Sequence, residues 1–170
     1  MCKRILPLVA LAFVLPAAAG NCPATHPVGS TEVCELFGQA SVPINPGDRF
    51  VKTIALPAGS TTDPNGVPVY SVQMKARPFA NTRNPAELSV KLTLSDASGG
   101  GAIELGGVTV PVSRDGDGRV SLAVPGRPFA QPAYLNLHLE SPRSAGAPNV
   151  MLQDLTVIQS FDSDVEGVTR

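Results

Sequence analysis

Four polar residues that alternate along one short segment carry the side chains best suited to binding a sugar. Tyr134, Asn136, His138 and Glu140 offer an aromatic ring, an amide, an imidazole and a carboxylate. Residues two apart in an extended strand point to the same side, so we expect these four to share one surface. The polar groups would hydrogen-bond sugar hydroxyls while the ring stacks on the sugar. The alternative is an ordinary strand face in contact with water.

Two arginines are further candidates, because each begins an Arg-Pro-Phe-Ala sequence between two expected strands. The copies begin at Arg77 and Arg127, and the similarity extends into the flanking segments, by internal repetition or by chance. Proline biases the residue before it towards extended conformations. We expect Phe79 and Phe129 to fold inward and cap the core, with both arginines at the same rim. There the arginines would contact an anionic ligand or, alternatively, bond to loop carbonyls or an acid.

The sequence carries no signature of a known catalytic centre. It contains no G-x-S-x-G nucleophile elbow, no H-E-x-x-H zinc motif and no Cys–His signature. Acidic residues are present, but their spacing does not single out a carboxylate pair of the kind that glycosidases use. Enzyme activity is therefore unsupported, and we expect neither a cofactor nor a metal ion.

An acidic, glycine-rich segment at residues 115–118, Asp-Gly-Asp-Gly, has two interpretations. A calcium loop needs several more oxygen ligands at fixed positions. Asp-Gly is also the favoured sequence of a tight hairpin turn. Because expected strands flank the segment on both sides, we predict a hairpin turn.

Strand signals dominate the rest of the chain. Proline and glycine are scattered, and short runs of alternating apolar residues recur between them, which is typical of a sandwich or barrel. The alternation is clearest at residues 88–94 and 135–139. We expect an all-β fold, an antiparallel, jelly-roll-like β-sandwich of about eight strands. The expected strands are residues 35–44, 48–57, 69–77, 86–95, 103–112, 119–124, 133–141 and 150–161.

The beginning of the chain has the three parts of a secretory signal peptide. Lys3 and Arg4 are basic, residues 5–15 are apolar apart from one proline, and residues 17–19 are three alanines suited to a cleavage site. The apolar run is shorter than the roughly 20 residues that span a bilayer. We therefore predict cleavage and export, to the periplasm or beyond, with no membrane span in the mature chain.

Cleavage would leave two cysteines, Cys22 and Cys34. In an oxidising compartment such a pair is expected to form a disulfide, which would stabilise the chain by roughly 3 kcal/mol. The alternative, metal ligation with His26, lacks a complete ligand set. The expected organisation is a signal peptide at 1–19, a disulfide-tied segment with the first strand at 20–47, the rest of a single β-sandwich at 48–161, and a flexible tail at 162–170.

The charge balance excludes one class of partner. Two of the 13 Lys and Arg residues leave with the signal, so 11 face 14 Asp and Glu and the net charge becomes −3. A mildly acidic chain with mixed charges lacks the basic footprint of a nucleic-acid-binding protein.

The C-terminal third resembles a known family. Residues 149–158, Asn-Val-Met-Leu-Gln-Asp-Leu-Thr-Val-Ile, form an apolar run that carries an acid, Asp154, directly before Leu155. This segment is similar to the last strand of galactose-binding-like jelly-roll domains, and residues 135–139 resemble their penultimate strand. The resemblance implies a β-sandwich of the carbohydrate-binding-module type, often with a structural calcium ion. The chain departs from such modules in having no tryptophan and two tyrosines, of which we expect Tyr70 in the core.

These features together predict an exported, non-catalytic binding module with a glycan as its ligand. The alternative is a structural, adhesion or surface-assembly subunit that contacts other cell-envelope proteins through its sheet edges.

Overall fold

The computed structural model describes most of the region in which strands are expected. The described residues are 32–57, 61, 68–79, 86–96, 101–113, 116, 118–130, 132–143 and 147–161. All eight expected strands are present, and three of them have the expected bounds. The strands are β1 (Glu32–Ile44), β2 (Arg49–Ala55), β3 (Val69–Pro78), β4 (Ala86–Ser95), β5 (Ile103–Val112), β6 (Arg119–Pro125), β7 (Tyr134–Glu140) and β8 (Val150–Phe161).

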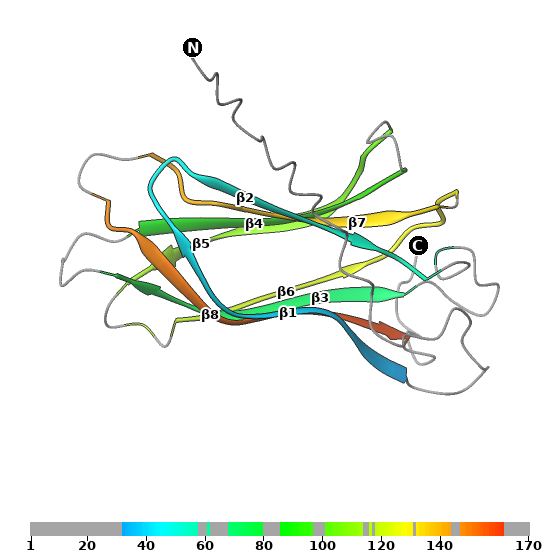
Figure 1. Ribbon diagram of the computed structural model, residues 1–170, viewed down its shortest axis with the longest axis horizontal. Helices are drawn as coiled ribbons and strands as arrows, with labels where there is room; N and C mark the ends of the chain where they lie inside the picture. The colour runs from blue at the N-terminus through cyan, green and yellow to red at the C-terminus, as the bar shows by residue number, and fades with distance from the viewer. Residues whose placement is uncertain are drawn as a thin grey trace, which may run out of the picture.

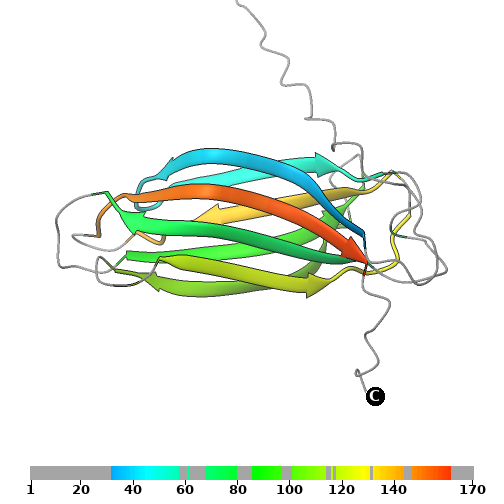
Figure 2. The ribbon, with the colours of Figure 1, turned by 90° about the horizontal axis from the view of Figure 1, so that it is seen from below.

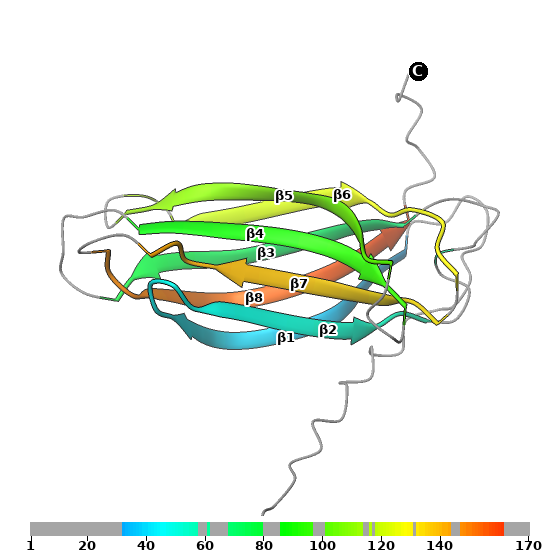
Figure 3. The same cartoon turned by 90° about the horizontal axis from the view of Figure 1, so that it is seen from above.

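The strands form two antiparallel sheets that face one another (Figure 1). The order in one sheet is β1-β8-β3-β6, which Figure 2 shows from its outer side. The order in the other sheet is β2-β7-β4-β5, seen from its outer side in Figure 3. The chain crosses between the sheets at every connection except the one from β4 to β5, and this order is that of a jelly roll. The predicted fold class is therefore confirmed.

The core lies between the sheets and uses the apolar faces expected from the alternation. Leu88, Leu92, Leu135 and Leu137 are fully buried, each with 0% of its surface exposed. Burying a leucine side chain stabilises a fold by about 1.5–3 kcal/mol, so these strands are held firmly against the opposite sheet. Tyr70 is also fully buried, as expected. Because residues on one face of a strand point inward, their neighbours in sequence must form the outer face.

The predicted hairpin turn at residues 115–118 is wrong. The strands on either side of it, β5 and β6, lie in different sheets and do not pair with each other. The chain therefore passes from one sheet to the other between β5 and β6. The described Gly118 adopts a φ of +70° beside the carbonyl of Ala76. Asp-Gly chemistry favours a sharp change of chain direction, but it does not determine whether the flanking strands become partners.

The expected common rim for the two Arg-Pro-Phe-Ala sequences is also wrong. Strand β3, which ends within the first copy, pairs antiparallel with β6, which precedes the second. The two connections therefore leave the sandwich at opposite ends, and Arg77 and Arg127 lie far apart along it. Phe129 packs partly buried against the core, as expected. Phe79 does not cap the core, because 69% of its surface is exposed.

Several predictions concern segments outside the described residues. The signal peptide at 1–19, Cys22 with its disulfide to Cys34, and the tail at 162–170 all involve such segments. Cys34 itself lies near the start of β1, opposite Gln159 of β8. The disulfide and the export signal therefore stay predictions. Within the described residues, no helix is long and apolar enough to cross a membrane.

Candidate functional site

A groove of about 500 Å³ runs along the outer face of the β2-β7-β4-β5 sheet. Three of the four residues singled out from the sequence, Asn136, His138 and Glu140, line it from β7. They face outward because their neighbours in sequence are buried in the core. The remaining described strand residues that line the groove are Arg49 of β2 and, on β4, Ser89, Lys91, Thr93 and Ser95. We call this surface the β7 groove.

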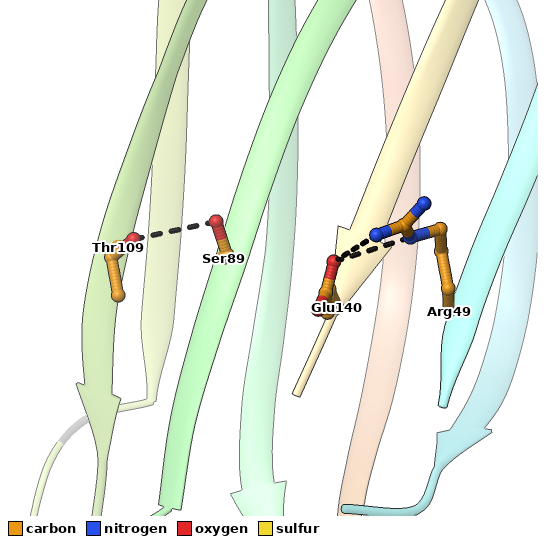
Figure 4. Close-up of polar contacts among 4 residues, drawn as sticks. All are labelled: Arg49, Ser89, Thr109 and Glu140. Atoms are coloured by element: carbon orange, nitrogen blue, oxygen red, sulfur yellow. Dashed lines mark hydrogen bonds and ion pairs between the residues drawn. The ribbon is translucent and has the colours of Figure 1, made fainter. Parts of the chain in front are cut away.

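One end of the β7 groove is a row of polar side chains across all four strands. The strand register places Arg49, Glu140, Ser89 and Thr109 side by side. Arg49 donates from Nε and from Nη2 to Oε2 of Glu140, at 3.2 and 3.1 Å. Thr109 Oγ1 donates to Ser89 Oγ at 3.3 Å. Figure 4 shows both contacts, which fix the four side chains across the sheet.

The centre of the β7 groove is formed by His138 and Lys91, which are directly opposite each other on β7 and β4. Lys91 Nζ donates to Glu104 Oε2 at 2.8 Å. Beyond Lys91 the partner on β5 is Gly107, where an added Cβ would lie 2.9 Å from the carbonyl oxygen of Val90. The glycine therefore permits the close approach of the two backbones and keeps the space beside Lys91 free of a side chain.

His138 is held as a neutral imidazole. Burial lowers its pKa below the ordinary value, and the positive charges of Lys91 and Arg49 lower it further. Its Nε2 lies 3.1 Å from Thr93 Oγ1. A neutral imidazole has one nitrogen that donates and one that accepts. His138 can therefore donate a hydrogen bond to a hydroxyl or accept one from it, without adding charge to the groove.

The floor of the β7 groove is a chain of hydrogen bonds centred on the buried Asn136, which links the buried Ser95 to the exposed Thr53. Thr53 Oγ1 donates to Asn136 Oδ1 at 2.8 Å, and Asn136 Nδ2 donates to Ser95 Oγ at 2.9 Å. Asn136, Thr93 and Ser95 are each exposed by less than 10%. Satisfied polar networks of this kind are rigid, since breaking one leaves a buried group unpaired. Asn136 therefore positions the surface rather than reaching out of it.

The remaining sequence candidates lie outside the β7 groove. Tyr134 shares the face but sits beyond the lining residues, at the end of β7, opposite Ser95 and Ala55. Arg77 and Arg127 are exposed and belong to the other sheet and to the connection after β6. In the described part of the chain, the His, Cys, Asp and Glu residues form no group of three or more that could hold a metal ion.

The residues that sequence reasoning missed are Arg49, on β2, and Ser95, on β4. The alternation at residues 87–94 predicts a polar face of Glu87, Ser89, Lys91 and Thr93, but not which strand lies beside it. Only the pairing of β4 and β2 with β7 brings these side chains together. That pairing joins residues far apart in the sequence, and no local pattern specifies it.

Comparison with known proteins gives similarity in structure only. No protein-family model and no curated protein matches the chain. Among solved structures, the CBM22-1 xylan-binding domain from Paenibacillus barcinonensis Xyn10C has a TM-score of 0.43 and 17% identity, covering 77% of this chain and 82% of that one. TmCBM61 in complex with β-1,4-galactotriose has a TM-score of 0.37 and 15% identity, covering 74% and 67%.

A third similar structure is the CBM36-1 domain of a multidomain xylanase from the hindgut metagenome of Trinervitermes trinervoides. It has a TM-score of 0.36 and 9% identity, covering 78% of this chain and 98% of that one. The expected resemblance to carbohydrate-binding β-sandwiches is thus found again among solved structures. Because each of these TM-scores is below 0.5, the likeness carries no argument about what this chain binds, and the geometry of its own residues must do so.

Proposed function

We propose that this protein is an exported, non-catalytic module that binds a glycan in the β7 groove. The observation that carries the proposal is the groove itself, which is lined by the His138 imidazole, by hydroxyls, by Lys91 and by the Arg49–Glu140 ion pair, over a floor held by the Asn136 amide. Sugar hydroxyls are both donors and acceptors, and such a mixed set of fixed partners suits them. The groove is open, so an extended chain could pass along it.

The charge of the β7 groove favours a neutral sugar chain. Arg49 pairs with Glu140 and Lys91 pairs with Glu104, while His138 is kept neutral. Each cation is thus balanced by an acid within the same surface. A charged ligand would have to break these pairs, whereas hydroxyl groups can bond to them as they stand. Export is supported by the predicted signal peptide and by the cysteine pair that remains after cleavage.

The test is binding of the purified mature protein to an array of neutral oligosaccharides, followed by calorimetry on the strongest ligand. His138→Ala should weaken binding by about tenfold, because one net hydrogen bond to a partly buried group contributes about 1.5 kcal/mol. Tyr134→Ala tests whether the ring at the end of the face stacks on the sugar. Gln39→Ala, an exposed position of β1 on the other sheet, is the matched control and should bind as the unaltered protein does.

Two outcomes would contradict the proposal. One is equal binding by the His138→Ala and Gln39→Ala variants, which would place the ligand elsewhere. The other is a protein that binds no glycan. If that protein formed concentration-dependent oligomers, assembly through β1 would replace glycan binding as the function. That edge strand has 13 residues and an exposed Val33, and among the described residues it pairs with β8 alone.

A further inference from the structure

A second groove, of about 530 Å³, lies on the outer face of the opposite sheet. It is lined from three neighbouring strands, β3, β6 and β8. Its hydrogen-bonding groups are the amide of Gln73 and the hydroxyls of Ser121 and Thr156. Its charged groups are Lys75, Arg119 and Asp154. We call this surface the β3 groove, and nothing in the glycan-binding proposal makes use of it.

The charge of the β3 groove differs from that of the β7 groove. Lys75 and Arg77 are two apart on β3 and point to the same side, and Arg119 lies directly opposite Lys75 on β6. The stem of Arg77 reaches Gly118, next to Arg119, where an added Cβ would lie 3.6 Å from Arg77 Cγ. Three cations therefore lie near this end of the face, Lys75 and Arg119 in the lining of the groove and Arg77 just beyond it.

Two of these cations, Lys75 and Arg77, lie on β3 beside a single carboxylate among the described residues that line the groove. That carboxylate is Asp154, and it pairs with Lys75 at 3.1 Å. Both partners are exposed, by 49% and 69% of the side chain, and such pairs are weak and easily exchanged for another partner. In the part of the chain that the structure describes, no acid pairs with Arg77.

The backbone at Asp154 is unusual in the same place. The register between β3 and β8 shifts between Gln73 and Lys75, so β8 carries one extra residue there. Asp154 takes a φ of +53°, the only positive φ of a described residue other than glycine. Bulges turn side chains towards new directions, and strained residues gather at functional sites. Here the bulge brings a carboxylate over Lys75, where it occupies the position an external anion would take.

We propose that the β3 groove is a second binding site, for a sugar chain that bears carboxylates, such as a uronate polymer. Lys75 and Arg77 would hold the carboxylate, with Asp154 giving up its ion pair on binding. Gln73, Ser121 and Thr156 would bond to the ring hydroxyls. The amide and hydroxyl groups beside the cations favour a sugar over a lipid surface, which would offer phosphate without a matching row of hydroxyls. With two sites on opposite faces, one molecule could bridge a neutral chain and an acidic one.

The experiment measures calorimetric binding of oligogalacturonate and of the same oligosaccharide with its carboxyls methyl-esterified. The two probes share their linkages and hydroxyls and differ in charge alone. Lys75→Ala and Arg77→Ala should each weaken binding of the acidic probe by about three- to fivefold. The matched control is Arg127→Ala, which removes the same charge from an exposed position at the opposite end of the sandwich and should leave the affinity unchanged.

Asp154→Asn gives the sharper test, because it should strengthen binding. Asparagine tolerates a positive φ as aspartate does, so the backbone is preserved while the competing carboxylate is removed. We expect about threefold tighter binding of the acidic probe, with binding of neutral glycans in the β7 groove unchanged. His138→Ala should weaken binding of neutral glycans and leave binding of the acidic probe unchanged. Failure of one site is therefore distinguishable from failure of the other.

Three results would overturn the proposal. The first is equal weakening by Arg127→Ala and Arg77→Ala, which would indicate non-specific attraction by net charge. The second is equal binding of the acidic and esterified probes. The third is weaker binding by Asp154→Asn than by the unaltered protein. Retention on vesicles of anionic phospholipid, lost in Arg77→Ala and without any binding of the acidic sugar, would assign the surface to a membrane instead.

Discussion

Polar side chains are arranged differently on the two outer faces of the sandwich. On the β2-β7-β4-β5 face, β7 pairs with both neighbours in unbroken register. Its polar side chains bond across the strands, from Arg49 to Glu140 and from Thr53 through Asn136 to Ser95. On the other face, the pairing of β8 with β3 is interrupted by a bulge. There the cations outnumber the acids along β3.

This difference shows how register controls the chemistry of a sheet surface. Where strands stay in register, opposite side chains meet as pairs and their charges and hydrogen bonds are satisfied within the sheet. At the bulge beside Asp154 the ion pair to Lys75 is exposed, and Arg77 on the same strand has no acid partner among the described residues. The first face is thus rigid and balanced, and the second is strained and cationic. Three measurements on the free protein test whether the two faces differ in this way.

The largest effect is expected for Asn136→Ala on the balanced face. The substitution leaves the buried hydroxyl of Ser95 without its amide partner and removes the acceptor of the exposed Thr53 hydroxyl. An unpaired buried polar group costs about 1–3 kcal/mol, so the free energy of unfolding should fall by about 2 kcal/mol. Urea denaturation followed by circular dichroism measures the change.

Thr156→Ala on the cationic face is the comparison for that measurement. The Thr156 hydroxyl makes a single long contact, 3.5 Å, to the carbonyl of Gln73 at an exposed position. Exposed substitutions of this kind change stability by less than about 0.5 kcal/mol. Equal losses in the two variants would show that the polar rows of the two faces do not differ in rigidity.

A smaller effect, of opposite sign on the two faces, is expected from exchanging glycine and alanine. Asp154→Gly and Asp154→Ala both remove the carboxylate, but a left-handed backbone costs a residue with a Cβ about 1 kcal/mol more than glycine. The glycine variant should therefore be the more stable by about that amount. At Ser89, in regular β4, glycine should instead be the less stable by about 0.5–1 kcal/mol.

Comparing the glycine and alanine variants at Asp154 and at Ser89 shows whether the left-handed backbone at Asp154 is strained. Chemical denaturation of all four variants under one set of conditions is sufficient. If alanine were the more stable residue at both positions, the left-handed conformation at Asp154 would not be strained. The bulge would then be an ordinary irregularity of the sheet rather than a strained feature of the β3 groove.

The strands could be predicted from the sequence because their signal is local. Alternation at residues 88–94 and 135–139 reports a core on one side of the strand. The apolar faces are buried as expected, but Thr93 and Asn136, expected on the solvent face, are buried as well. The three β7 residues of the β7 groove followed from the same period of two. Predictions from local sequence were wrong where the structure depends on which strands pair. The Asp-Gly sequence at 115–118 does not determine which sheets β5 and β6 join.

The two arginines illustrate the same limit. Identical Arg-Pro-Phe-Ala sequences suggested equivalent positions, yet the antiparallel pairing of β3 with β6 sends Arg77 and Arg127 to opposite ends. Phe79 and Phe129 then meet different surroundings, one exposed and one packed on the core. Likewise, Arg49 lies 91 positions before Glu140. The entropy of closing such a loop is set by the whole topology, which a single segment does not encode.

The smallest expected effect is a pH dependence that belongs to the balanced face alone. His138 is the only histidine among the described residues, and burial together with Lys91 and Arg49 lowers its pKa below the ordinary value of 6.5. Between the lowered pKa and 6.5 the unfolded chain binds more protons than the folded one, so stability rises with pH in that window. The stability contributed is fully present above about pH 6.5 and is lost as the pH falls towards the lowered pKa.

Urea denaturation at about pH 7 and about pH 5, on the unaltered protein and on His138→Gln, tests this sign. Glutamine keeps a hydrogen-bonding group opposite Thr93 and removes the titration, so the loss of stability on acidification should be smaller in the variant. Glu140 and Glu104 remain in both proteins, so their own titration cancels in the comparison. A larger loss in His138→Gln would mean that the imidazole gains a proton on folding. The β7 groove would then carry a positive charge near neutral pH, and its distinction from the β3 groove would disappear.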